Sequence, residues 1–302
     1  MGVLTSGPAR RRGLRFPGRF DNLREIRTLD PERDTDRILW LTSRHEFPWD
    51  YTQGTSIAFL RDYGVPSIAA LLHATGEFEK HGVKRYDDTL LIAEEATLDG
   101  LDSPRGHAAV RRLNRIHAHH DIPADEFRYV LATTIVGPVR WIEQYGWRPL
   151  DPVELAAIAT HTTRFGRLMG LTDLPTTYQG YLELLISYER SHFRFEPANR
   201  LVTESTLRAA RAAAPRALRP FVRRITISLM DRPLLDALGL EPSPRWLVRS
   251  LHLGLRARAH LLRFAPPRRT PYRHRPSTYP QGYSLGDLGP ASMLDELNAR
   301  PA

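Results

Sequence analysis

Apolar residues recur every three or four positions along most of the chain, which is the spacing of amphipathic α-helices. No two stretches alternate between apolar and polar residues as neighbouring β-strands do. The helices predicted from this spacing cover about residues 34–44, 54–64, 65–82, 86–100, 102–120, 124–146, 151–170, 175–195, 199–214, 217–238 and 244–264. The pattern therefore predicts an all-α fold.

Polar residues, glycine and proline mark where several of these helices begin, bend or end. Asp102 or Ser103 is the expected N-terminal cap of the helix that follows it, and Gly82 is the expected end of another. Pro138 is expected to kink the long apolar helix that contains it, because proline lacks the N–H group that a helix interior needs.

The chain divides into three segments by composition. Residues 1–20 are predicted to form a basic, flexible tail, and residues 21–264 a single helical domain. Residues 265–302 are predicted to form a proline-rich extended tail, because the prolines within 265–290 prevent a continuous helix.

The amino-acid composition excludes several kinds of functional site and limits the expected partners. The 302 residues include no cysteine, which excludes disulfides, zinc–thiolate sites, thiolate-ligated haem and cysteine nucleophiles. The net charge of +9 suits an anionic membrane or a nucleic acid as partner, but no nucleic-acid-binding motif accompanies it, so no nucleic-acid partner is expected. No apolar stretch reaches transmembrane length, and we expect a cytoplasmic protein, with peripheral membrane contact as the other option. Nothing in the sequence indicates the oligomeric state.

The stretch RRLNRIHAHHDI, residues 111–122, holds three histidines. The residues that share the apolar face of this helix are Val110, Leu113, Ile116 and His117. One interpretation of His117 is a core or helix-end histidine with a local hydrogen bond. A second is an axial ligand of haem iron, which a neutral imidazole on an apolar face suits. A third is a zinc site shared with His120, for which further ligands are not evident.

Several ordered blocks resemble one family. They are EFPWDYTQGTSIAFLRDYGVPSIAALLHATGEFEKHGVKRYDDT, GLDSPRGHAAVRRLNRIHAHHDI, YVLATTIVGPVRWIEQYGWRPL and STYPQGYSLGDLGP. Together they are similar to the MpaB-type oxygenases, whose catalytic domain is shared with the rubber oxygenases, or latex-clearing proteins. The resemblance runs from about residue 35 to 290 and is nearer to the MpaB branch.

The resemblance implies an all-α fold with a globin-like core that binds haem b, with His117 as the ligand of the iron. It also implies an oxidoreductase that uses dioxygen to oxidise or cleave a C=C bond of a lipophilic, isoprenoid-like substrate. The alternative is a non-catalytic haem- or lipid-binding helical protein at a membrane surface.

The resemblance also assigns the distal side of the haem, through KRYDDT. Arg85 and Thr89 match residues that line this pocket in the rubber oxygenases, and their spacing places them on one helical face. Asp88 stands where those enzymes have a lysine, so it is expected either to relay protons in catalysis or, with Asp87, to cap a helix that begins near Thr89.

Other residues have two interpretations each. Arg140 is a candidate partner for a haem propionate, or a surface residue in cation–π contact with a nearby tryptophan. Phe127 and the apolar residues after it form either a substrate channel or ordinary core. Met169 and His161 are candidate haem neighbours by residue type alone.

The helix predicted at 244–264 is basic and amphipathic. One stripe contains Leu247, Leu251, Leu255 and Leu262, and another contains Arg249, Arg256 and Arg263. It either lies on an anionic membrane, helped by the basic residues at 9–19, or packs on the core with its arginines outward.

Overall fold

A computed structural model describes residues 18–299 of the chain. Helices make up its regular structure, and the described residues contain no β-strand, which confirms the all-α prediction. The basic tail expected at 1–20 lies almost wholly outside the described residues. None of the described helices is both long and apolar enough to cross a lipid bilayer.

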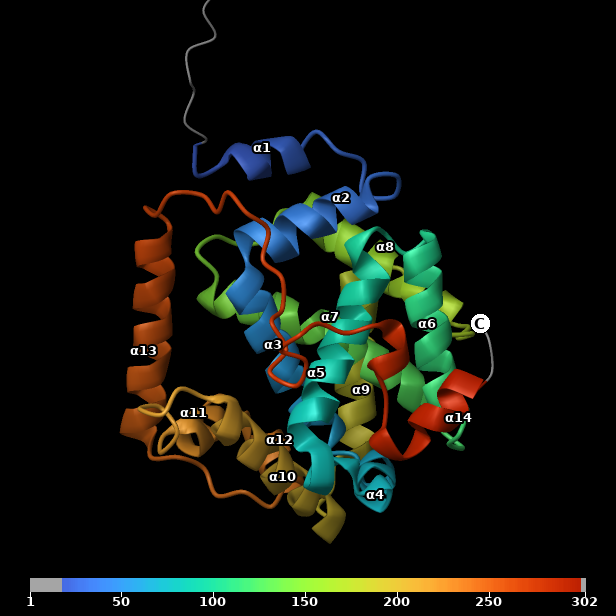
Figure 1. The fold of residues 1–302 in the computed structure, drawn as a ribbon. Helices are drawn as coiled ribbons and strands as arrows, with labels where there is room; N and C mark the ends of the chain where they lie inside the picture. The colour runs from blue at the N-terminus through green and yellow to red at the C-terminus, as the bar shows by residue number, and fades with distance from the viewer. Residues whose placement is uncertain (1–17, 300–302) are drawn as a thin grey trace, which may run out of the picture.

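The elements follow one another with short connections, and Figure 1 shows their arrangement. The first half of the chain forms α1 (Asp21–Ile26), α2 (Thr35–Trp40), the π-helix η1 (Leu41–Glu46), α3 (Pro48–Asp62), α4 (Pro66–Thr75), α5 (Glu77–Leu98), α6 (Pro104–His117) and α7 (Ala124–Tyr145). The second half forms α8 (Pro152–Leu168), α9 (Tyr178–His192), α10 (Pro197–Ala213), α11 (Val222–Ser228), α12 (Arg232–Ala237), α13 (Arg245–Leu262), the 3₁₀ turns η2 (Leu285–Asp287) and η3 (Ala291–Met293), and α14 (Leu294–Ala299).

Helix α7 runs through the centre and packs against α3, α8, α9 and α13. It continues through Pro138 as a single element of 22 residues. Its crossing with α3 is unusually close: a Cβ added to Gly54 would lie 2.5 Å from the Cα of Pro138, and one added to Gly137 would lie 2.5 Å from the Cβ of Ala58. Only small residues allow two helix backbones to approach this far.

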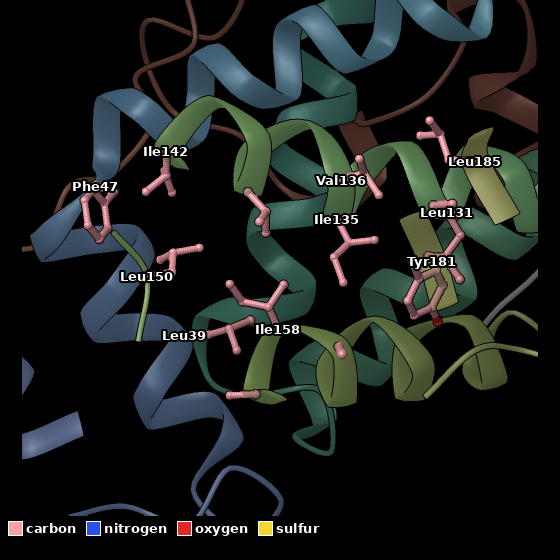
Figure 2. Packing of buried hydrophobic residues seen from close by; sticks show 14 of the residues in the cluster. Leu39, Phe47, Leu131, Ile135, Val136, Ile142, Leu150, Ile158, Tyr181 and Leu185 are labelled. Atoms are coloured by element: carbon pink, nitrogen blue, oxygen red, sulfur yellow. The ribbon is translucent and has the colours of Figure 1, made fainter. Parts of the chain in front are cut away.

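The main core surrounds α7. Figure 2 shows branched and aromatic side chains from several helices interleaved there, among them Leu39, Phe47, Leu131, Ile135, Val136, Ile142, Leu150, Ile158, Tyr181 and Leu185. Leu131 and Ile135 of the suggested channel wall are thus ordinary core residues.

Two of the predicted helix boundaries, at Ser103 and Gly82, can be compared with the structure. Ser103 is confirmed as the cap of α6, because its hydroxyl accepts the N–H of Gly106 at 2.9 Å. The predicted end near Gly82 corresponds to a kink within α5, because the backbone of His81 leaves the helical conformation. A second break, which was not predicted, falls at Gly76, whose φ of +66° ends α4. Only glycine adopts such a φ at little cost.

The segment after α13 wraps around the domain, and we call residues 268–298 the C-terminal strap. It is mostly non-helical, with the turns η2 and η3 and most of α14 near its end. The strap crosses α5 and α6 (Figure 1, orange to red). Asp87 on α5 accepts hydrogen bonds from the backbone N–H and hydroxyl of Thr278, at 2.9 and 2.7 Å, and Arg112 on α6 donates to the carbonyl of Leu288 at 2.8 Å. The strap therefore ties these two helices together.

Candidate functional site

His117 is the last residue of α6, and its ring lies against that of Phe127 at the start of α7, with 5.1 Å between ring centroids. Its Nδ1 atom is buried and has no hydrogen-bond partner among the described residues. Burial, and then the positive charge of Arg85 and the proximity of His120, lower the pKa of His117 to about 4. The imidazole is therefore neutral at neutral pH, which is the form that binds a metal.

A cavity of about 280 Å³ opens beside this imidazole. It lies where the end of α6 meets the start of α7 and the end of α8, and its lining consists of Asn114, His117, Ala118, His120, Phe127 and Met169. The amide of Asn114 donates to the carbonyl of Leu168 at 2.9 Å and so holds α6 and α8 together here. Of the two candidate haem neighbours, Met169 lines this cavity, whereas His161 is buried on α8 and is not part of the lining.

Arg85 lies on α5, close enough to His117 for its charge to affect that side chain. Its guanidinium donates to the hydroxyl of Thr89 at 3.3 Å and lies 5.8 Å from the ring of Phe78. No carboxylate lies within ion-pair distance of it in the described part of the chain, and burial lowers its pKa. A partly buried cation without an ion-pair partner is unfavourable, so this position favours an anionic group of a ligand.

Asp88 instead forms hydrogen bonds that hold the C-terminal strap. It is 1% exposed and accepts three hydrogen bonds, from the ammonium of Lys84 at 2.6 Å, the hydroxyl of Tyr279 at 2.6 Å and the backbone N–H of Gly289 at 3.2 Å. The helix-cap interpretation of Asp87 and Asp88 is wrong, because α5 begins ten residues earlier, at Glu77. These bonds leave little capacity on Asp88 for a bound molecule.

Arg140 lies elsewhere. It is an exposed residue of α7 that lines a second cavity, of about 590 Å³, beneath α13. Phe127 and Arg140 are separated by about 20 Å along α7, since each helical residue rises about 1.5 Å. The cation–π interpretation applies instead to Arg148, whose guanidinium lies 5.4 Å from the ring of Trp147. The structure thus brings Arg85 and Thr89 near His117 but not Arg140.

The side chains around the cavity could provide one imidazole ligand for a haem iron, but not the several ligands of a metal ion bound by protein alone. Within residues 18–299, no three histidine or acidic side chains converge where they could hold a metal ion, so His117 and His120 lack the further ligands of a zinc site. A haem iron needs only one or two protein ligands. The cavity lies just below the usual range for ligand pockets, about 300–1,000 Å³. Binding a macrocycle therefore requires Phe127 and the flexible Met169 to move.

Two largely desolvated histidines make the stability of the protein depend on pH. The pKa values of His117 and His161 are both lowered to about 4, chiefly by burial, whereas an unfolded histidine has a pKa of about 6.5. Between these values only the unfolded state takes up the proton, so stability falls as the pH drops from about 6.5 to 4. We expect each histidine to contribute on the order of 2–3 kcal/mol to this loss.

Urea unfolding at several pH values between 7 and 4 measures this effect. Replacing His161, which lies outside the cavity, with phenylalanine should make the stability less dependent on pH over this interval. The exposed His260, replaced in the same way, is the control. An unchanged pH dependence in His161→Phe would contradict the assignment.

The region that contains this site is similar to a known protein family. The family described as "ER-bound oxygenase mpaB/B'/Rubber oxygenase, catalytic domain" matches residues 54–264. That range includes Arg85, Asp88, Thr89, His117 and Arg140. It also ends at the residue that closes the turn after α13.

Curated fungal proteins are similar over part of their length. The chain is 30% identical to ER-bound oxygenase mpaB' of Penicillium brevicompactum over 243 residues, which is 74% of this chain and 57% of that protein. It is 33% identical to ER-bound oxygenase mpaB of the same species over 144 residues, which is 45% of this chain and 37% of that protein. The corresponding protein of Penicillium roqueforti is 32% identical over 148 residues, 46% of this chain and 50% of that protein. The chain thus spans about half the length of the curated relatives it matches.

Proposed function

The chain belongs to the family of the MpaB and rubber oxygenase catalytic domain, and from that premise we propose that it is a haem-b-dependent oxygenase. Its reaction is the oxidation or cleavage of a C=C bond in a lipophilic, isoprenoid-like substrate by dioxygen. The observation that carries this proposal is the neutral imidazole of His117, which borders a cavity and whose buried Nδ1 has no partner among the described residues.

His117 would hold the haem iron, and a bound haem would supply the centre for dioxygen chemistry. Arg85 would direct its N–H groups at an anionic partner, either a propionate or a developing negative charge on oxygen. Thr89 positions Arg85, because its hydroxyl accepts from the guanidinium while donating to the Arg85 carbonyl at 2.8 Å. Phe127 and Met169 would exclude water and accommodate an apolar substrate.

One observation favours a second candidate, a haem-binding protein without oxygenase activity. The hydrogen bonds of Asp88 to Lys84, Tyr279 and Gly289 commit it to the strap. The residue at the position of the rubber oxygenase lysine is therefore not directed toward a ligand. Arg85 and Thr89 alone would then have to control the distal side.

Reconstitution with haemin tests the proposal. The purified chain should bind about one haemin with a Soret band that differs from that of free haemin. The reconstituted protein should consume oxygen when given a short isoprenoid alkene and release carbonyl products. Haem binding without oxygen consumption would support the second candidate. A chain that remains colourless after reconstitution would contradict both.

Variants of the distal residues test their roles separately from haem binding. Arg85→Gln should retain haem but slow oxygen-dependent turnover by about 10²–10³-fold, as removal of a single preorganised donor does in other enzymes. Thr89→Val should have a smaller effect, because it leaves the guanidinium present but less fixed. Arg111→Gln, an exposed change on α6, is the control. Wild-type turnover in both Arg85→Gln and Thr89→Val would rule out this assignment.

A further inference from the structure

Helix α13 stands at one edge of the molecule, beside α11 (Figure 1, left). Its leucine stripe, composed of Leu247, Leu251, Leu255 and Leu262, is half-buried and faces the body of the protein. Ala259 is buried on the same face. Among these leucines, Leu262 packs against the main core.

The opposite, outer face of α13 is also apolar. The side chains along it are Trp246, Leu253 and Leu261, which are 69%, 66% and 71% exposed, and Phe264 in the turn that follows, which is 75% exposed. Leu218 and Phe221, just before α11, are also exposed. We call Trp246, Leu253, Leu261 and Phe264 the outer ridge. A helix that only covered a core would have polar residues there, so the ridge indicates a binding partner.

Arginines flank the outer ridge. Helix α13 contains no acidic residue, and Arg245, Arg249 and Arg256 are exposed along it, with Arg263 just beyond its end. None of the four has a carboxylate within ion-pair distance in the part of the chain that the structure describes. By contrast Arg258, on the inner face, pairs with Asp50 at 2.9 Å. The free positive charge is therefore concentrated beside the apolar ridge.

We propose that the outer ridge and its flanking arginines dock on the surface of an anionic lipid bilayer. The apolar side chains would enter the boundary between headgroups and acyl chains, and the arginines would bind lipid phosphates. A basic polar face combined with tryptophan, phenylalanine and leucine is typical of helices that lie in this interface. Two copies of the chain associating through this face would bring arginine against arginine, which disfavours a dimer.

The 590 Å³ cavity lies beneath α13, so part of the inner face of the helix is not backed by close-packed core. Ile57, Val136 and Val248 provide apolar lining, and Arg245 and Arg249 of the flank also border the cavity. The helix can therefore adjust its angle to a membrane without disrupting the core around α7. This docking proposal does not depend on haem or on turnover.

Vesicle sedimentation tests the proposal. The full chain should bind vesicles that contain phosphatidylserine far more tightly than vesicles of phosphatidylcholine alone, and added salt should weaken the binding. Arg249→Gln with Arg256→Gln should weaken it about 25-fold, from about fivefold for each arginine. The exposed pair Arg111→Gln with Arg190→Gln, on α6 and α9, removes the same charge elsewhere and should have little effect.

A second pair of variants tests the apolar part. Leu253→Asp should weaken binding at least tenfold, whereas Leu201→Asp, at an exposed leucine of α10, should not. In the wild type, brominated lipids should quench a part of the tryptophan fluorescence that is missing in Trp246→Phe. Circular dichroism verifies folding, which these exposed positions should not affect.

Three results would overturn the proposal: no binding to anionic vesicles at low salt, equal weakening by Leu201→Asp and Leu253→Asp, or a dimer in analytical ultracentrifugation that Leu253→Asp dissociates.

Discussion

His117→Ala is expected to weaken haem binding by more than about 100-fold and to remove the ligated Soret band. Loss of a group that merely supports a metal ligand already reduces affinity by about 10–100-fold, and His117 is proposed as the ligand itself. The variant should fold, because it removes a buried imidazole whose Nδ1 has no partner among the described residues. Haemin titration followed by absorption measures the effect.

The chain offers a matched control for this experiment. His120 lines the same cavity three residues away, so His120→Ala should retain both the affinity and the spectrum. Adding imidazole to His117→Ala should partly restore the spectrum, because the deletion leaves room for it. If His117→Ala kept the wild-type spectrum, another residue would be the ligand.

Asp88→Ala is expected to destabilise the protein by about 3 kcal/mol, near the low end of the range for breaking a buried ion pair from one side. The change leaves the Tyr279 hydroxyl with only its bond to the Asp287 carbonyl, and leaves the Lys84 ammonium with only two backbone carbonyls. Urea unfolding measures the loss. Trypsin should also cleave the strap faster after Arg269 and Arg273, which are exposed and become flexible once the strap detaches.

Asp88→Asn separates an anchoring role from a catalytic one. The amide keeps the shape and can still accept from Tyr279, so it should be less destabilising than alanine. Glu296→Ala, which removes an exposed carboxylate paired with His119, should change stability by less than about 0.5 kcal/mol. Full stability combined with lost turnover in Asp88→Asn would mean that Asp88 acts in the chemistry.

The helical fold could be predicted because its determinants are local. Apolar spacing and caps such as Ser103 act over one or two turns of helix, so they can be found by reading along the chain. The boundary between α4 and α5 at Gly76 was missed, because only tertiary structure shows that this glycine adopts a positive φ, whereas the stop expected near Gly82 corresponds to the kink at His81.

The candidate site could be predicted only in part. The apolar face of α6 singled out His117, and the resemblance added Arg85 and Thr89, which the structure places nearby. The cavity lining from α8, the strap bonds of Asp88 and the remote position of Arg140 depend on contacts between distant segments. Such contacts leave no periodic signal in a single sequence. The outer ridge was not predicted, because the prediction for α13 considered only its leucine and arginine stripes.

The strap also affects the order in which the protein matures. Thr278 and its partner Asp87 are 191 positions apart, and Asn298 and its partner Arg112 are 186 apart. Contacts over such separations form late in folding, and synthesis from the N-terminus delays them further. During synthesis, the strap can therefore connect α5 and α6 only after most of the chain has been made.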